Sequence, residues 1–203
     1  VGRVANVEKL IADRGGFKGT IGIAHTRWAT HGGVTERNAH PHRDDGRLGH
    51  GIAIIHNGII ENFQELKREL EAKGCTFQSD TDTEVVAQLL TEEVKAGKSP
   101  REAVSAVLKR LHGAFGLAII FAGHSNLIFG ARLNSPLAVG YGDGEMFLGS
   151  DALALAPLTQ RISYLEEGDW VVLTRKSVAI RDERGARLAA RVHLVPVFAT
   201  GRG

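Results

Sequence analysis

The sequence predicts an α+β domain of mostly antiparallel sheets covered by helices, and three observations support this class. Helical patterns are grouped before residue 112, and short strand-like segments are grouped after it. These segments follow one another at short spacing, with Gly, Asn, Pro or Asp between them, which is typical of antiparallel pairing. The length of 203 residues fits one domain, and we assign residues 1–203 to it.

Composition and charge argue against several kinds of partner. The hydrophobic fraction of 43% and the charged fraction of 24% are ordinary for a globular protein with a sizeable core. The net charge is only +2 at pH 7, and no stretch concentrates Lys and Arg, so no nucleic-acid partner is expected. The longest apolar stretch, residues 117–122, is too short to span a bilayer, so no membrane partner is expected.

The two ends and the cysteine content bear on location. Cys75 is the only cysteine, so an internal disulfide is impossible and a reducing, cytoplasmic location is expected. No charged-then-apolar leader opens the chain. The chain begins at Val1 and not at Met, so we expect it to be a piece of a longer protein.

The first half of the chain predicts two helices and two strands. Residues 3–13 carry apolar side chains at helical spacing, and residues 20–24 have the small and β-branched side chains of a buried strand. A long polar loop, residues 33–50, follows, and such loops are often functional. Residues 52–56 predict a buried strand, with Asn57 and Gly58 on its connection to a helix over residues 63–73.

Two helices and a series of strands are predicted next. A short strand over residues 76–78 precedes a capping-box pattern at Thr81–Glu84, and a second such pattern stands at Ser99–Glu102. The two helices that these patterns open are expected to be antiparallel neighbours. The predicted strands that follow are 114–121, 127–131, 137–140, 146–148, 162–164, 170–174, 178–181 and 192–198.

Residues 22–32 bring several chemical groups together at the end of an apolar segment. His25, Thr26, Arg27, Trp28, Thr30 and His31 fall within seven positions, and Gly32 and Gly33 turn the chain after them. An arginine can hold a carboxylate through two parallel hydrogen bonds, so a small zwitterion could bind here. A strand end with a surface arginine and a half-buried tryptophan is the alternative.

Two further positions could act on a substrate. An amide side chain and a backbone N–H at Asn57 and Gly58 can point at one oxygen, as an oxyanion hole requires, although a glycine-assisted turn would have the same sequence. Asp82 could accept from a substrate ammonium group, or it could favour the start of its helix.

Three other patterns favour structural readings. Six histidines lie between His25 and His56, but no pair has the i, i+4 spacing of a helical zinc motif, so no metal is expected. The glycines at 140, 142 and 144 are followed by a strand and not by a helix, which excludes a dinucleotide loop. Cys75 follows the glycine that ends a helix, a position that does not activate a thiol, so it is not expected to be a nucleophile.

Taken together, several motifs resemble the glutaminase domains of glutamine–fructose-6-phosphate aminotransferases, which are class II glutamine amidotransferases. The motifs occur in order over essentially the whole chain: 22–32, 38–42, 56–62, 79–84, 135–137, 150–151 and 166–169. The resemblance implies the N-terminal nucleophile hydrolase fold, a four-layer αββα sandwich of mostly antiparallel sheets. It also implies a reaction that releases ammonia from glutamine without a metal or an organic cofactor.

The resemblance implies a role for each matching residue. Arg27 would hold the α-carboxylate of glutamine, assisted by Thr30 and His31, and Asp82 would accept from its α-ammonium group. Asn57 and Gly58 would form the oxyanion hole. Trp28 would lie on a loop that closes over glutamine.

The chain departs from the family at both ends. The family's nucleophile is an N-terminal cysteine, and the resemblance implies that it stands upstream of Val1, so the fragment is expected to be N-terminally truncated and inactive alone. Fructose 6-phosphate would bind to a C-terminal domain that lies outside the chain, in a full-length homo-oligomer. The alternatives are a non-catalytic relative that binds glutamine or a partner, and the glutaminase domain of another class II amidotransferase.

Overall fold

A computed structural model describes residues 4–26, 32–44 and 51–194 of the chain. Its helices are α1 (Val4–Asp13), the 3₁₀ turn η1 (Glu36–Asn38), α2 (Phe63–Ala72), α3 (Thr83–Lys95), α4 (Pro100–Leu108) and α5 (Ala152–Leu155). Its strands are β1 (His42–Arg43), β2 (Ile52–Ile60), β3 (Gly113–Phe121), β4 (Ile128–Leu133), β5 (Ala138–Tyr141), β6 (Met146–Gly149), β7 (Arg161–Tyr164), β8 (Trp170–Leu173), β9 (Val178–Arg181) and β10 (His193–Leu194).

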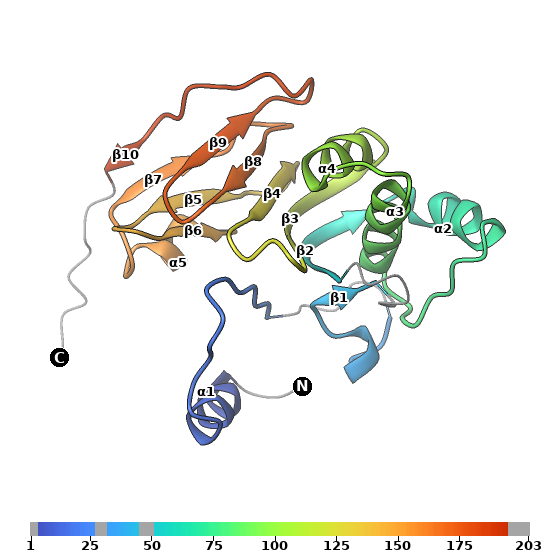
Figure 1. Ribbon diagram of the computed structural model, residues 1–203, viewed down its shortest axis with the longest axis horizontal. Helices are drawn as coiled ribbons and strands as arrows, with labels where there is room; N and C mark the ends of the chain where they lie inside the picture. Colours follow the sequence, from blue (N-terminus) through green and yellow to red (C-terminus); the bar gives the residue numbers. More distant parts are fainter. Residues whose placement is uncertain (1–3, 27–31, 45–50, 195–203) are drawn as a thin grey trace.

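These strands form two antiparallel sheets, which confirms the α+β class. The larger sheet has the order β1-β2-β3-β4-β8-β9, and the smaller has the order β10-β7-β5-β6. Every pairing between the named strands is antiparallel. The smaller sheet packs on β8 and β9 of the larger one. Figure 1 shows α3 and α4 beside the larger sheet, with α2 next to α3.

The main core lies between the larger sheet and its helices. Leu70 of α2, Leu90 of α3 and Val104 of α4 are fully buried there, in one cluster with Ile54 and Leu117 of the sheet. Burial of such aliphatic side chains is worth about 1.5–3 kcal/mol each. A second cluster joins the two sheets, and a third packs α5 against the smaller sheet. The structure is therefore layered, with α5 as the one described helix on the far side of the smaller sheet.

The strand β2 is longer than the sequence predicts. It does not end at His56 but runs through Asn57 and Gly58 to Ile60, paired with β3 throughout. The prediction that Asn57 and Gly58 lie on a strand-to-helix connection is therefore wrong. The physical reason is that Gly58 has a φ of 120°, a backbone conformation that glycine adopts without cost, so the ladder continues where a turn was expected.

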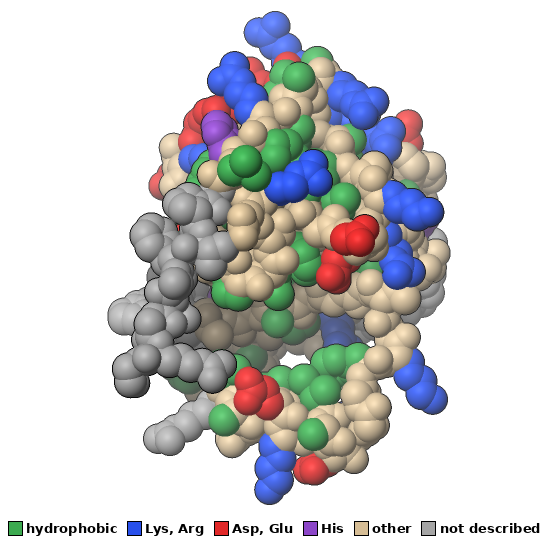
Figure 2. All heavy atoms as spheres, turned by 90° about the vertical axis from the view of Figure 1, so that its left-hand side faces the viewer, with side chains coloured by type: hydrophobic (Ala, Val, Ile, Leu, Met, Phe, Trp, Pro, Cys, Tyr) green, Lys and Arg blue, Asp and Glu red, His purple; other side chains and the backbone are tan. Residues whose placement is uncertain are grey.

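The helices between residues 63 and 108 are confirmed, and α3 packs against α4 as expected. The helix at the N-terminus also forms, but it buries none of its residues. Figure 1 shows α1 apart from the two sheets, and in Figure 2 an open space separates it from the rest of the molecule. Val4, Val7 and Leu10 are each at least half exposed.

Only one of the two predicted capping boxes forms. At Ser99–Glu102 the side chain of each residue bonds the backbone N–H of the other. At α3 the N-cap residue Asp82 makes no capping hydrogen bond, and Glu84 turns back instead to accept from the backbone of Gln78 and Ser79 and from the Ser79 hydroxyl. Glu84, which the sequence pattern assigns to a helix cap, therefore stabilises the loop before α3 instead.

Glu84 is expected to be important for stability for this reason. The Glu84 side chain is buried, and its replacement by alanine would leave the backbone N–H groups of Gln78 and Ser79 without an acceptor and remove a bond from the Ser79 hydroxyl. We expect Glu84→Ala to lower the free energy of unfolding by about 3 kcal/mol or more. The matched control is Glu102→Ala, which removes an exposed capping carboxylate. Equal losses in a urea titration of the two variants would contradict this account.

Most of the later strands agree with the predicted ones to within two residues, but two earlier strands do not form. Residues 20–24 form no strand, and Ile21 and Ile23 are only half-buried, so the predicted buried strand is wrong. Residues 76–78 form no strand either. Both segments are held by side-chain contacts, such as that from Thr20 Oγ1 to Ser125 O. Of residues 192–198, only β10 is a described strand.

Candidate functional site

One edge of β2 carries a row of backbone N–H groups that face away from β3. Successive N–H groups of an antiparallel strand alternate between its two sides. The N–H of His56 donates to His40 Nδ1 at 3.2 Å, and that of Ile60 donates to Asp82 Oδ2 at 2.7 Å. Side chains therefore satisfy this edge of the strand where β1 no longer covers it.

Gly58 lies between these two positions in the same row. Its N–H consequently faces the same side of β2 as those of His56 and Ile60. A Cβ atom at Gly58 would lie 2.0 Å from Ala114 O of the neighbouring strand, so no other residue fits this backbone. Within the described chain, no loop or side chain accepts from this N–H. The edge thus presents a backbone donor.

The side chain of Asn57 lies at a cavity between the two sheets. This cavity has a volume of about 210 Å³ and is lined by residues that include His25, Thr26, Asn57, Gly116 and Ser150. His25 Nε2 lies 2.6 Å from Asn57 Oδ1. Asn57 and Gly58 are consecutive, so a side-chain amide that lines this cavity is followed directly by the backbone N–H donor on the strand edge.

Asp82 reaches the same edge of β2 from the start of α3. Its carboxylate is buried and accepts from Ile60 N–H, and Oδ2 lies 3.9 Å from His56 Nδ1. Gly58 is two positions before Ile60 on β2, a spacing of about 7 Å. The Asp82 carboxylate therefore lies on the same strand edge as the Gly58 N–H, about one such step away. The Asp82 side chain makes no capping hydrogen bond to α3, which argues against a role limited to stabilising the start of this helix.

Histidines pack behind this edge. The rings of His25 and His40 are stacked with their centroids 4.3 Å apart, and His42 meets His40 edge-on at 4.8 Å. His42 Nε2 lies 3.0 Å from Thr81 Oγ1, and His56 Nδ1 lies 2.9 Å from Thr83 Oγ1. In the described ranges, no group of three or more histidine, cysteine or acidic side chains is arranged to hold a metal ion.

The loop before α3 is tied to the polar loop that follows residue 31. Asn38 is fully buried; its amide contacts the Asp80 carboxylate, and its oxygen accepts from Asp80 N–H. Arg37 forms an ion pair with Asp80, and its hydrogen bond lowers the pKa of that carboxyl below the ordinary value. These contacts fix the position of Asp82 two residues later.

Four of the predicted binding residues, Arg27, Trp28, Thr30 and His31, lie outside the described residues. The chain enters that segment from Thr26, which lines the cavity. It returns at Gly32, where a Cβ atom would lie 2.6 Å from Asn38 Nδ2.

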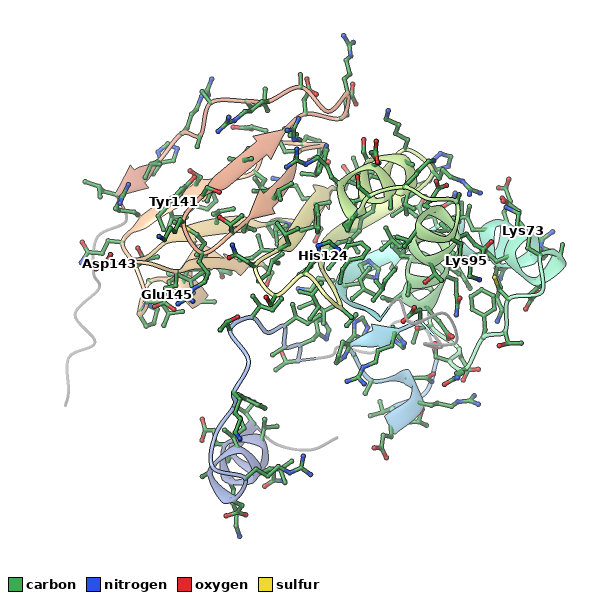
Figure 3. The ribbon with its side chains drawn as sticks, in the orientation of Figure 1. Lys73, Lys95, His124, Tyr141, Asp143 and Glu145 are labelled. Carbon is green, nitrogen blue, oxygen red and sulfur yellow. The ribbon has the colours of Figure 1, made fainter. Side chains whose placement is uncertain are left out.

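Two other patterns lie away from the cavity. Cys75 is half-buried after α2, where its Sγ lies 3.8 Å from Glu92 Oε1, and it does not line the cavity. Gly140 lies within β5, and the glycines at 142 and 144 belong to the turn between β5 and β6, which is closed by a hydrogen bond from Gly142 N–H to Glu145 O. Figure 3 shows Tyr141, Asp143 and Glu145 at this turn, on the opposite side of the molecule from Lys73.

Sequence reasoning missed the contact between His25 and Asn57. The pattern placed His25 among the polar residues after a strand, and nothing in its spacing indicates a partner 32 positions later. The buried network around Glu84 was missed for a related reason, because its sequence is also that of a common helix cap.

Comparison with known families defines the class of protein to which this layered fold and its cavity belong. A family described as "Glutamine amidotransferase domain" matches residues 25–157, which is more than half of the chain. The chain therefore belongs to the glutamine amidotransferase domain family. In the described part, no helix is both long enough and apolar enough to cross a membrane.

Curated relatives are more specific. The glutamine–fructose-6-phosphate aminotransferase (isomerizing) of Zymomonas mobilis is 60% identical over 181 residues, which are 89% of this chain and 29% of that protein. The protein of the same name from Brucella suis is 58% identical over 182 residues, with 90% and 29% covered. The chain thus spans less than a third of the length of these relatives.

Solved structures share the fold. Glutamine phosphoribosylpyrophosphate amidotransferase from B. subtilis, complexed with ADP and GMP, has a TM-score of 0.66 at 23% identity over 78% of this chain and 34% of its own. A second structure, described as the allosteric regulatory enzyme of purine biosynthesis, has the same TM-score at 25% identity and the same coverage.

Proposed function

We propose that this chain is the glutamine-binding part of a glutamine–fructose-6-phosphate aminotransferase and that its cavity holds the side-chain amide of glutamine. The observation that carries this proposal is the pair of donors at Asn57 and Gly58, one facing the cavity and one on the adjoining strand edge. The relatives of that name, at 58–60% identity, support fructose 6-phosphate as the molecule that receives the ammonia.

The chemistry follows from the placement of the donors. A thiolate attacks the carbonyl carbon of the glutamine amide, and negative charge develops on the carbonyl oxygen. The Gly58 N–H and the Asn57 amide donate to this oxygen and stabilise the tetrahedral intermediate. The proton given up by the thiol passes to the amide nitrogen as the intermediate collapses, so ammonia leaves and a thioester remains. Water then hydrolyses the thioester, which gives glutamate and frees the thiol.

The nucleophile in this proposal is an N-terminal cysteine outside the 203 residues, because Cys75 does not line the cavity. The chain alone is accordingly expected to bind glutamine without hydrolysing it. Ammonia then aminates fructose 6-phosphate on a C-terminal domain of a cytoplasmic homo-oligomer. In the complete domain, the layers seen here would belong to a four-layer αββα sandwich.

The α-carbon of glutamine is held at the other end of the substrate. We assign its carboxylate to Arg27, with Thr30 and His31, and its ammonium group to Asp82, while Trp28 closes over it. The buried carboxylate of Asp82 supports this assignment, since it lies beside the row of N–H groups that includes Gly58.

Asp82→Asn tests the proposal in the full-length protein. Asparagine can still accept from Ile60 N–H, so the fold is retained while the charge is removed. We expect KM for glutamine to rise about tenfold or more, the value of one hydrogen bond to a charged group. Asp143→Asn, on the β5–β6 turn, is the matched control. An unchanged KM in Asp82→Asn would remove this residue from the binding site.

A further inference from the structure

The proposed oxyanion hole has a requirement that Asn57 cannot meet alone. The oxygen and the nitrogen of an amide side chain are almost the same size, so packing alone does not determine which one faces the cavity. Only the NH₂ group can donate to a developing oxyanion, and an amide turned the other way would present a repelling oxygen. Some neighbouring group must therefore select the orientation.

We propose that His25 is a positioning residue that holds Oδ1 of Asn57, so that the Asn57 NH₂ group faces the reacting carbonyl. This inference rests on the proposed function. His25 Nε2 lies 2.6 Å from Asn57 Oδ1. An amide oxygen can only accept, so His25 Nε2 must carry the hydrogen in this contact. With the hydrogen on Nε2, the reversed amide would place two donors against each other and lose this bond.

The orientation of the His25 ring is itself fixed by β2. His25 stacks on His40, with an angle of 23° between the ring planes. His40 Nδ1 accepts from the backbone N–H of His56, so the ring of His40 is anchored to the strand that carries Asn57. The strand β2 therefore carries the Asn57 amide and also fixes, through His40, the position of the His25 ring that orients this amide.

The His25 ring has no competing hydrogen bond within the described residues. Its Nδ1 atom is buried and has no hydrogen-bond partner there. The tautomer with hydrogen on Nε2 leaves only a lone pair unpaired at the buried Nδ1. The tautomer with hydrogen on Nδ1 would leave an N–H donor unpaired there, which is the more costly group to bury without a partner. The contact with Asn57 is thus the hydrogen bond that this ring is placed to make.

Two substitutions distinguish the contribution of the His25 N–H donor from that of its aromatic ring. His25→Phe keeps an aromatic ring for stacking on His40 and removes the N–H, whereas His25→Gln removes the ring and restores an N–H near the position of Nε2. In the full-length protein, we expect His25→Phe to lower kcat for glutamine hydrolysis about 10–100-fold with KM within threefold. We expect His25→Gln to recover kcat to within about fivefold of the wild type.

The measurement is glutamate release over a range of glutamine concentrations that reaches saturation, with kcat expressed per folded molecule from a thermal melt. His124→Ala is the matched control, because His124 is an exposed histidine on the β3–β4 turn (Figure 3). If His25→Phe does not fold, His25→Leu takes its place. Equal losses in the Phe (or Leu) and Gln variants would show that the ring and not the donor matters, and would overturn the inference.

A double substitution distinguishes the inference from the proposed function. If His25 acts through Asn57, adding His25→Phe to Asn57→Ala lowers kcat no further, since the amide to be oriented is absent. Additive losses would overturn the inference. A large loss for Asn57→Ala with wild-type kcat for His25→Phe would overturn the inference alone, while unchanged kcat in both variants would overturn the proposed function.

Discussion

Asn57→Ala is expected to lower kcat for glutamine hydrolysis by the full-length protein about 10²–10³-fold, the usual loss for one oxyanion-hole donor. KM for glutamine should change little, because the amide donates to charge that develops after binding. The side chain is half-buried at the cavity, and its removal leaves no other described side-chain amide there. Steady-state glutamate release gives both constants.

Asn57→Asp sharpens this test. An aspartate at position 57 can still accept from His25, but it cannot donate to an oxyanion. We expect it to be at least as slow as Asn57→Ala. Asn126→Ala, whose side chain accepts from Arg175 N–H on a remote turn, is the matched control. A change of less than threefold in kcat for Asn57→Ala would mean that Asn57 is only a structural residue of β2.

Gly58→Ala is expected to have the largest effect on stability. At a φ of 120°, the new Cβ would lie 2.0 Å from Ala114 O, where contacts below 3.0 Å require the backbone to move. The strands β2 and β3 are central to the larger sheet, so this shift disturbs the main core. We expect a loss of about 4 kcal/mol or more in the free energy of unfolding.

Gly113 provides a matched control in the same pair of strands. It also has a φ of 120°, and a Cβ there would lie 2.3 Å from Ile59 O. Gly113→Ala should destabilise the protein to a similar extent, as urea titration would show. Its kcat per folded molecule should exceed that of Gly58→Ala, because only Gly58 has its N–H in the proposed site. Wild-type stability of Gly58→Ala would contradict the backbone geometry described here.

The parts of the fold that depend on local patterns could be predicted from the sequence. The helices α2, α3 and α4 have apolar side chains at helical spacing, and the strands from β3 to β9 are short apolar segments between turn residues. The extension of β2 to Ile60 could not be predicted, because it depends on a glycine conformation that only the pairing with β3 selects. Glu84 was misread because its partners lie before the helix and not at its cap.

The candidate site was predictable only in part for a similar reason. Ile60 and Asp82 are 22 positions apart, and the hydrogen bond between them at one edge of β2 depends on the packing of α3 on the sheet. The contact that orients Asn57 comes from His25, across 32 positions. Local sequence indicates which groups can do chemistry, while the sheet determines which of them meet. Arg27 remains a prediction, since it lies outside the described residues.

The most direct test of the central claim is a crystal structure of the full-length protein with an aldehyde analogue of glutamine, whose carbonyl carbon a thiolate attacks. We expect the resulting oxygen to lie about 2.7–3.1 Å from both the Gly58 N–H nitrogen and Asn57 Nδ2, with His25 Nε2 still within hydrogen-bond distance of Asn57 Oδ1. An oxygen bound by other donors, with Asn57 and Gly58 turned away from it, would contradict the account.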